Sequence, residues 1–223
     1  NYAVDPVLLK NYLPTGTHLE LWNNQCYLSL VGFMFLETKF LGVKFPLHTN
    51  FPEVNLRFYV NRNTLQERKR GVVFIKEVVP LPVVTFIANT FYKEHYHTMP
   101  MRHSWKIAKE KISVEYAWKK NEWYSMKIVS NPASHPIVEN SIYSFFTDNP
   151  WGFNRLSESR TLAYEVEHPV WKFYDTLDYS INVDFEKVYG PAFSFLNHQE
   201  PDSVFLIEGS EVTLEKGKEI NLD

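Results

Sequence analysis

Short segments in which apolar and polar residues alternate recur along this chain, and they restrict it to a fold made mainly of β-strands. The clearest segment is 53–60, where one face is apolar: Val54, Leu56, Phe58 and Val60. The other face carries polar groups: Glu53, Asn55, Arg57 and Tyr59. A period of two residues is the signature of a strand whose two faces have different surroundings.

Further strands are expected where alternation or apolar runs recur, at 25–37, 72–78, 112–118, 123–129, 159–166, 176–184 and 204–207. Helical spacing is confined to a segment that begins at Asp5-Pro6 and to segments near 83–91 and 138–146. Residues 61–70 are expected to form an exposed charged turn, and the polar tail 211–223 to fray. The sequence therefore predicts a mainly β (α+β) fold, an antiparallel β-barrel or cone with a few short flanking helices.

Length and charge limit the classes of protein that this chain can belong to. Its 223 residues suit one domain spanning 1–223. A net charge of −3 does not provide the basic field that nucleic-acid binding requires. There is no apolar run long enough to cross a bilayer and no basic-then-apolar leader, and the one cysteine, Cys26, suits a reducing compartment. We therefore expect a cytoplasmic protein with a small-molecule partner, and leave homo-oligomerisation open.

The polar face of segment 53–60 has two interpretations. It lies either in solvent on an exposed strand or inside a barrel, because unpaired buried polar groups are costly. In the second interpretation Glu53 and Arg57 form a charged pair at the floor of a pocket, and Tyr59 adds a hydroxyl.

A second candidate is a segment rich in histidine and methionine: His95, His97, Met99, Met101, His103 and Trp105. If the segment is extended, these side chains share one face, unless Pro100 introduces a bulge. Two histidines alone do not make a metal site, because a third ligand is needed. We interpret the segment as a semi-polar pocket wall and expect neither a metal nor a cofactor.

Two lysines are candidate nucleophiles. Lys76 has the same strand parity as Val72 and Phe74, and Lys93 directly precedes the histidine-rich segment. A lysine on an apolar face usually extends to water, whereas a buried one has a lowered pKa and can act as an amine nucleophile.

Several stretches, taken in order, resemble one family: 4–14, 27–33, 51–60, 71–74 and 168–171. The most specific is Glu-Val-Asn-Leu-Arg-Phe-Tyr-Val at 53–60. Together they are similar to the YqjF-like family of uncharacterised conserved bacterial proteins, which is related to acetoacetate decarboxylase. The resemblance implies a β-barrel or cone with a central pocket, but no particular reaction.

The resemblance also implies where catalytic groups would lie. The decarboxylase uses a Schiff-base lysine beside a second lysine, with nearby glutamate and arginine side chains. The matching place in this chain is near His95-Tyr96-His97, which has no lysine pair, and Lys93 lies close by. Glu53 matches a pocket glutamate.

These observations lead to one function hypothesis and leave one alternative open. We predict a pocket for a small anionic or carbonyl-bearing molecule, with Lys76, Lys93 and Glu53 as candidate catalytic residues. The expected substrate-binding residues are Arg57, Tyr59, His95, His97, Met101 and Trp105. The alternative is a ligand-binding or interaction protein without turnover, so the sequence does not decide whether the chain is an enzyme.

Overall fold

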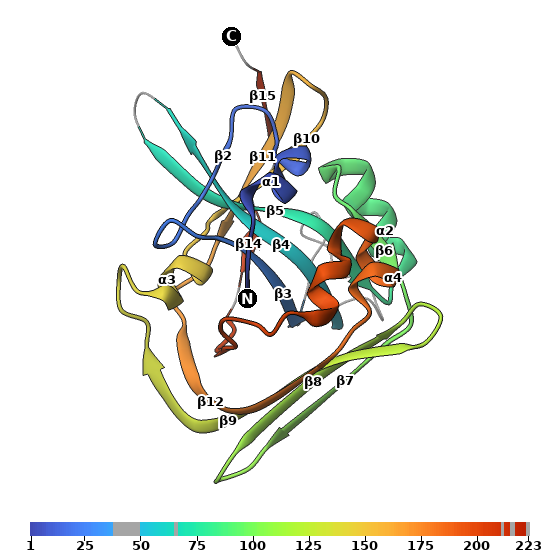
Figure 1. Ribbon diagram of the computed structural model, residues 1–223, viewed down its shortest axis with the longest axis vertical. Coiled ribbons are helices and arrows are strands. Elements are labelled where there is room, and N and C mark those ends of the chain that lie inside the picture. The colour runs from blue at the N-terminus through green and yellow to red at the C-terminus, as the bar shows by residue number, and fades with distance from the viewer. Residues whose placement is uncertain (38–49, 65–66, 211, 215–216, 222–223) are drawn as a thin grey trace.

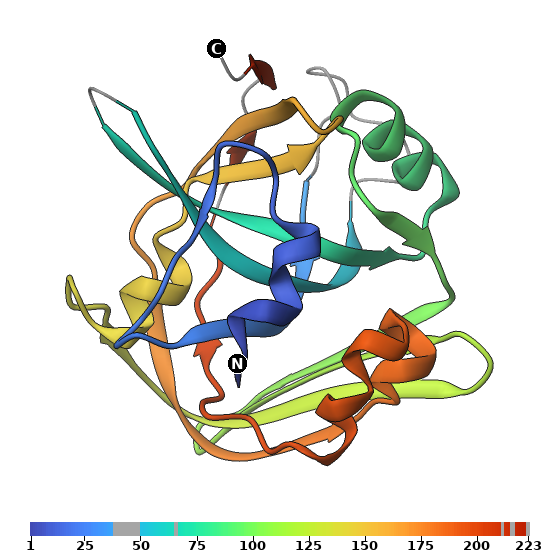
Figure 2. The ribbon, with the colours of Figure 1, turned by 45° about the horizontal axis from the view of Figure 1, so that its top comes forward.

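Two β-sheets packed against each other form the protein. The computed structural model describes residues 1–37, 50–64, 67–210, 212–214 and 217–221. The first sheet has the strand order β1-β3-β4-β5-β10-β11-β14, with β2 on β4, β6 on β5 and β15 on β11. The second sheet, with the order β13-β12-β9-β8-β7, curves across one side of the first (Figure 1). Helix α4 and the 3₁₀ helix η3 lie between the two sheets at one end (Figure 2).

The strands of the first sheet are β1 (Tyr2–Val4), β2 (His18–Leu19), β3 (Cys26–Phe35), β4 (Phe51–Asn63), β5 (Arg68–Val79), β6 (Tyr96–Thr98), β10 (Trp151–Arg155), β11 (Arg160–Glu167), β14 (Thr213–Leu214) and β15 (Lys218–Asn221). Those of the second are β7 (Met101–Ile107), β8 (Ile112–Lys119), β9 (Trp123–Pro136), β12 (Lys172–Asn182) and β13 (Leu206–Ile207). The helical elements are α1 (Pro6–Leu9), η1 (Lys10–Tyr12), α2 (Pro82–Ile87), η2 (Ala88–Tyr92), α3 (Ile142–Thr147), α4 (Phe185–Tyr189) and η3 (Pro191–His198).

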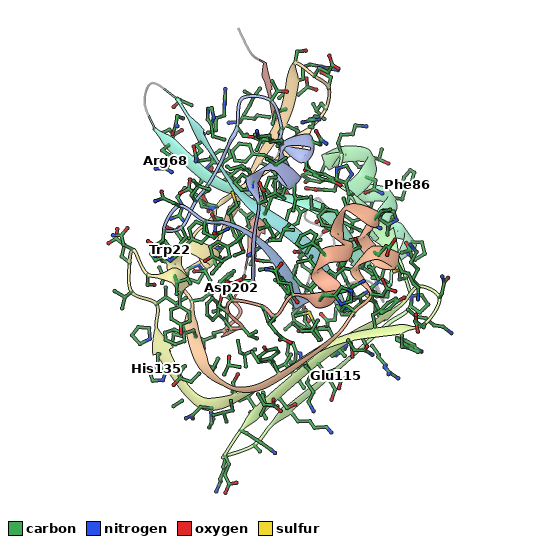
Figure 3. All side chains as sticks on the ribbon, viewed as in Figure 1. Trp22, Arg68, Phe86, Glu115, His135 and Asp202 are labelled. Carbon is green, nitrogen blue, oxygen red and sulfur yellow. The ribbon has the colours of Figure 1, made fainter. Side chains whose placement is uncertain are left out.

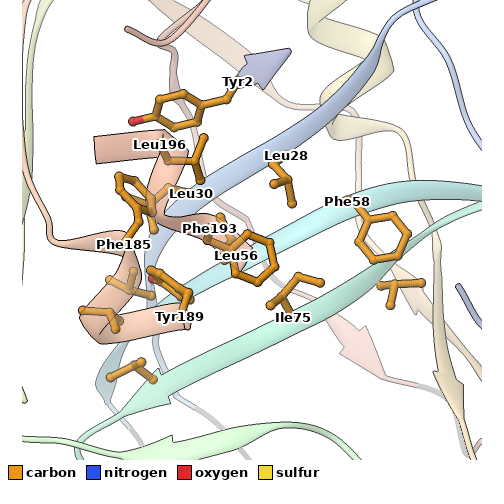
Figure 4. Packing of buried hydrophobic residues seen from close by; sticks show 14 of the residues in the cluster. Tyr2, Leu28, Leu30, Leu56, Phe58, Ile75, Phe185, Tyr189, Phe193 and Leu196 are labelled. Carbon is orange, nitrogen blue, oxygen red and sulfur yellow. The ribbon is translucent and has the colours of Figure 1, made fainter. Parts of the chain in front are cut away.

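The main hydrophobic core lies between the sheets. The apolar face of β4 contributes Val54, Leu56 and Phe58, which are fully buried. Phe185 and Phe193, from α4 and η3, pack against the same face (Figure 4). Trp118 from β8 belongs to the same buried cluster, so both sheets share one core. Burying large aromatic and aliphatic side chains is the dominant stabilising contribution in such a core.

The opposite face of the first sheet is covered by short elements. Near one end of β4, the rings of Phe145 and Phe146 from α3 pack against Tyr59 at 5.2 and 5.3 Å. Near the other end, Phe51 packs with Val84 of α2. Since both ends of this face are capped by apolar clusters, the polar residues of β4 between them are shielded from water.

Sequence-encoded caps explain where two of the helices begin. Asp5 caps α1 by accepting a hydrogen bond from the Val7 backbone amide at 2.8 Å, with Pro6 at the first position. Ser141 and Ser144 form a reciprocal capping box that starts α3. Both helices were expected from the sequence, although each is shorter than its apolar spacing indicated.

The mainly β prediction is confirmed, but the strand pairings do not close the sheets into a barrel. The expected hairpin of 112–118 and 123–129 is present as β8 and β9. The turn predicted at 61–70 is wrong in extent, because β4 continues to Asn63 and β5 begins at Arg68. Part of the tail that was expected to fray pairs with β11 through β14 and β15.

The histidine-rich segment is divided between the two sheets. β6 pairs in parallel with β5, whereas β7 is an edge strand of the second sheet. The chain leaves one sheet and enters the other at Met99-Pro100, where proline cannot donate a ladder hydrogen bond. The side chains of this segment therefore do not form one wall. Among the described residues, no helix is long and apolar enough to span a bilayer.

Gly71 allows β5 and β10 to approach closely. A Cβ atom added at this position would lie 2.2 Å from the Trp151 carbonyl oxygen, which is a backbone atom and cannot rotate away. We expect Gly71→Ala to lower the free energy of unfolding by about 1–3 kcal/mol or more, as measured by urea denaturation. The matched control is Gly209→Ala, because nothing lies within 4 Å of its added Cβ. Equal stability of the two variants would contradict this packing.

Candidate functional site

The polar face of β4 leads into a cluster of buried carboxyl groups. Glu53 and Asn55 lie on this face and are each 1% exposed. On the neighbouring strand Glu77 is directly opposite Asn55 and is 2% exposed. Ionisable side chains are rarely buried to this degree without a charged partner, so this cluster is the most unusual chemical feature of the protein.

A β-bulge decides which β5 side chains join the cluster. The pairing of β4 with β5 shifts between Leu56 and Arg57, so that Phe74 is opposite Arg57 but Lys76 is opposite Leu56. The extra residue reverses the alternation beyond Ile75. Lys76 is therefore on the face that packs against the main core, and Glu77 is on the polar face.

The segment after α2 adds a third carboxyl group. The π-helical turn η2 is followed by Lys93 in the left-handed conformation, with φ of 55°. Such irregular turns are often found at functional sites. Beyond this turn the side chain of Glu94 is 7% exposed. Asn89 fixes Tyr96, two residues after Glu94, by accepting a hydrogen bond from the Tyr96 amide at 2.8 Å and donating one to the Tyr96 carbonyl at 3.0 Å.

Two more polar residues come from β10 and β11. Asn154 donates a hydrogen bond to the Tyr92 carbonyl at 2.9 Å, and Tyr164 donates one to the Glu94 carboxylate. Tyr164 is opposite Gly152, where an added Cβ would lie 2.1 Å from the tyrosine ring. Since Gly152 has no side chain, the ring can lie across β10.

Hydrogen bonds join these groups into one network. The Asn55 amide nitrogen donates to Glu53 Oε1 at 2.9 Å, and the Tyr96 hydroxyl donates to Glu53 Oε2 at 2.7 Å. Glu77 and Glu94 are hydrogen-bonded to each other through their side chains. The cluster therefore joins β4, β5, β6, β11 and the turn after η2.

Burial raises the pKa of all three carboxyl groups. The pKa of Glu53 rises to about 7, because desolvation outweighs the hydrogen bonds from Asn55 and Tyr96. The pKa of Glu77 is well above its ordinary value, first through desolvation and then through the charges of Glu94 and Glu53. Desolvation also raises the pKa of Glu94, against the lowering effect of the hydrogen bond from Tyr164.

Glu77 and Glu94 share a proton. Two carboxylates cannot hydrogen-bond to each other, because neither has a hydrogen to donate. Their mutual hydrogen bond therefore requires one proton between the two groups, and burial, which raises both pKa values, favours retaining it. Oε2 of each residue is buried and has no hydrogen-bond partner from any other described residue. The pair is a carboxylic acid bonded to a carboxylate.

Two other polar atoms at the site have no hydrogen-bond partner among the described residues. They are Asn55 Oδ1, an acceptor beside the carboxyl groups, and Arg57 Nε, a donor two residues along the same face of β4. The Arg57 guanidinium uses one of its other nitrogens to donate to the Phe146 carbonyl at 3.2 Å. Buried polar atoms in folded proteins are normally paired, so these two atoms are exceptions.

The residues predicted from the polar strand face do lie on one face, but they differ in their surroundings. Glu53 is in the carboxyl cluster, and Arg57 is partly buried at its edge. Tyr59 is further along, where its hydroxyl is 2.7 Å from Ser29 Oγ and its ring packs against α3.

The candidate lysines do not join the cluster. Lys76 is on the opposite face and donates a hydrogen bond to the Val188 carbonyl at the end of α4. Burial and the charge of Lys120 lower its pKa. Lys93 is exposed.

The remaining predicted residues are separated from the carboxyl groups. His95 and His97 are exposed, and burial of part of each ring lowers its pKa. Met101 packs against the main core. Trp105 on β7 is 45% exposed and donates a hydrogen bond to the Tyr116 hydroxyl at 3.1 Å.

Sequence reasoning missed Glu77, Glu94, Asn154 and Tyr164. A signal existed for Glu77, since it is a lone acid in the apolar run 72–79. Glu94 and Tyr96 depend on the π-helical turn, which residue spacing did not indicate. The segment that the family resemblance aligned with the lysine pair does reach the cluster, but through Glu94 and Tyr96.

Two surface grooves lie away from this cluster. One of about 290 Å³ is lined by His135, Tyr143, Phe173 and Asp175, with His135 Nε2 3.0 Å from the Asp175 carboxylate. Figure 3 shows His135 on the second sheet. The other, of about 240 Å³, includes Glu122 and Asp184. No group of three or more histidine, cysteine or acidic side chains among the described residues is arranged to hold a metal ion.

Comparison with known proteins places the chain in a family. Residues 1–211 match the DUF2071 family, described as "Uncharacterized conserved protein (COG2071)". The chain belongs to this family. No curated protein matches the chain.

Solved structures with the same fold are distant in sequence. Acetoacetate decarboxylase from Legionella pneumophila has a TM-score of 0.60 and 9% identity, with 98% of this chain and 82% of that chain covered. The enduracididine biosynthesis enzyme MppR complexed with pyruvate has a TM-score of 0.63 and 12% identity, covering 97% and 84%. An acetoacetate decarboxylase-like enzyme from Sphingomonas wittichii RW1 has a TM-score of 0.55 and 11% identity, covering 98% and 86%. The DUF2071 chain therefore has the acetoacetate decarboxylase-like fold.

The raised carboxyl pKa values make stability depend on pH. Above pH 4.5, the ordinary glutamate pKa, the unfolded chain releases protons that the folded chain retains, so the free energy of unfolding falls as pH rises. The contribution of Glu53 to the free energy of unfolding falls until about pH 7. We expect Glu53→Gln to gain stability relative to the unsubstituted protein across this window, by about 1.4 kcal/mol per unit of pKa shift.

Urea unfolding measured from pH 4.5 to pH 8 checks this expectation. The control is Glu139→Gln, because Glu139 is exposed. A stability difference that does not change with pH would show that Glu53 ionises normally.

Proposed function

We propose that this protein binds a small carbonyl-bearing or anionic molecule at the carboxyl cluster and catalyses proton transfer on it. The observation that carries the proposal is the acid–carboxylate pair of Glu77 and Glu94 beside Glu53. Pairs of carboxyl groups whose pKa values are driven apart serve as acid and base in known enzymes. The similarity to MppR, solved in complex with pyruvate, supports the choice of ligand.

Each residue has a role in this proposal. Arg57 holds an anionic group of the ligand through its unpaired Nε. Glu77 keeps its proton at neutral pH and donates it toward the carbonyl oxygen. Glu53, with a pKa of about 7, removes a proton from the carbon next to the carbonyl, so that ketone and enol interconvert. The proton lost from carbon goes to Glu53, and the one gained by oxygen comes from Glu77.

Neither candidate lysine has a role in this proposal. A Schiff base requires an amine at the carbonyl carbon, but Lys76 projects from the other face of the first sheet and Lys93 is exposed. Acid–base chemistry without a covalent intermediate is thus preferred over the lysine-dependent reaction. Binding without turnover is the alternative proposal. A single domain, homo-oligomerisation and a cytoplasmic location stay predictions.

Proton exchange at carbon tests the proposed function directly. We expect the protein to accelerate exchange of the methyl protons of pyruvate in heavy water, followed by NMR, with a rate that rises with pH through about 7. Glu53→Gln and Glu77→Gln should each lower the rate by about 10²–10⁴-fold. Glu139→Gln should not change it. Pyruvate binding without any accelerated exchange would favour the non-catalytic alternative.

Trapping with borohydride tests the exclusion of lysine chemistry. We expect no covalent adduct on Lys76 or Lys93 after incubation with pyruvate and borohydride, as determined by mass spectrometry of proteolytic peptides. The physical reason is that Lys76 is bonded to the Val188 carbonyl and separated from the carboxyl cluster by the sheet itself. A stoichiometric adduct on Lys76 that disappears in Lys76→Arg would contradict the proposed mechanism.

A further inference from the structure

The carboxyl cluster has an excess of acceptors and acid groups over cations. Glu53, Glu77 and Glu94 lie together with the carbonyl oxygen of Asn55. Arg57 is the charged side chain on the adjoining stretch of β4, and its hydrogen bond goes to α3 instead of to any carboxyl group. The raised pKa values of the three carboxyl groups favour protons in this cluster.

Asn55 gives an independent indication of the chemistry that this site would bind. It is 1% exposed, and its nitrogen is fixed on Glu53, so its oxygen cannot exchange places with the nitrogen without losing that bond. Its oxygen is left without a donor. Asn55 is opposite Glu77 in the sheet, so its side chain lies on the same face as the acid pair. A ligand group that completes the site must therefore bring N–H or O–H donors.

Arg57, two residues further along β4, has a donor without an acceptor. Its buried Nε has no acceptor. Arg57 and Asn55 are alternate residues on one strand face, so their Cα atoms are about 7 Å apart. A ligand with a few carbon atoms between two charged ends would reach both positions.

We propose that the ligand is amphoteric: it places a cationic nitrogen group, such as an ammonium or a guanidinium, among the three glutamates and its anionic end on Arg57. This inference rests on the proposed function and names the class of its substrate. The cation supplies the donors that Asn55 Oδ1 lacks and replaces protons held by the carboxyl groups. Charge-assisted hydrogen bonds of this kind are stronger than neutral ones.

Proton release follows from this exchange of a cation for protons. The groups that face the cluster are Glu53, Glu77 and Glu94 from β4, β5 and the turn after η2, Tyr96 and Tyr164 from β6 and β11, and Arg57 at the edge. Burial keeps the pKa of both tyrosines well above the neutral range, so the carboxyl groups are the source of any proton released near pH 7.

Three probes of similar length separate the two ends of the ligand. 4-Guanidinobutanoate carries both charges, pentanoate only the anion and butylguanidinium only the cation. Isothermal titration calorimetry of the full chain at pH 7, in two buffers of different ionisation enthalpy, gives the affinity and the number of protons released. We expect 4-guanidinobutanoate to bind about tenfold or more tightly than either single-charge probe, with release of about one proton.

Variants assign each end. Glu94→Gln should bind 4-guanidinobutanoate no more tightly than pentanoate. Arg57→Gln should bind 4-guanidinobutanoate no more tightly than butylguanidinium. The control Glu139→Gln should retain both differences in affinity. If Glu94→Gln does not fold, as judged by circular dichroism, proton release by the unsubstituted protein still decides the question.

Contrary results separate this inference from the proposed function. Equal binding of pentanoate and 4-guanidinobutanoate, or binding without proton release, would overturn the inference and leave pyruvate exchange as evidence for the proposed function. Binding of Mg²⁺ or Ca²⁺ that Glu94→Gln abolishes and that 4-guanidinobutanoate does not displace would also overturn it. No binding of any probe, together with no exchange of pyruvate protons, would remove both.

Discussion

Strand β4 is buried on both faces, and the chemistry of the site depends on this constraint. One face supplies the centre of the hydrophobic core, so the strand cannot rotate to expose its polar side. A shift of one residue would place Glu53 and Asn55 in the hydrophobic core and Val54 and Leu56 among the polar groups of the other face. The energy gained by packing the apolar face therefore holds the carboxyl groups in an environment that they would not occupy by themselves. Their raised pKa values are the consequence.

Two local irregularities determine which groups share that environment. The bulge in β5 turns Glu77 toward the cluster and Lys76 away from it, and the π-helical turn with Lys93 brings in Glu94. Neither feature stabilises the fold in an obvious way, because each interrupts regular hydrogen bonding. Their combined effect is to place three acids together and to keep the lysine on the other face. This arrangement differs from a lysine-based site in charge.

Much of the fold could be predicted from the sequence, and the candidate site only in part. Strict alternation of apolar and polar residues predicted β4 and the β8–β9 hairpin, because successive side chains of a strand point to opposite faces of the sheet. The same reasoning correctly placed Glu53, Asn55 and Arg57 on one face. It failed for Lys76, because one extra residue in β5 moves the side chains that follow it to the other face of the sheet. Residue composition does not reveal such a bulge. This reasoning also failed for the histidine-rich segment, which divides between two sheets at Met99-Pro100, a long-range outcome that local spacing does not encode.

The central claim is that the folded protein keeps a carboxyl group protonated at neutral pH. NMR titration of protein labelled with ¹³C at the glutamate carboxyl carbons measures this directly, and single Glu→Gln variants assign the signals. The account predicts that the Glu77–Glu94 pair retains a proton at pH 7 and that Glu53 titrates near pH 7. Titration of Glu53, Glu77 and Glu94 all near pH 4.5 would contradict it.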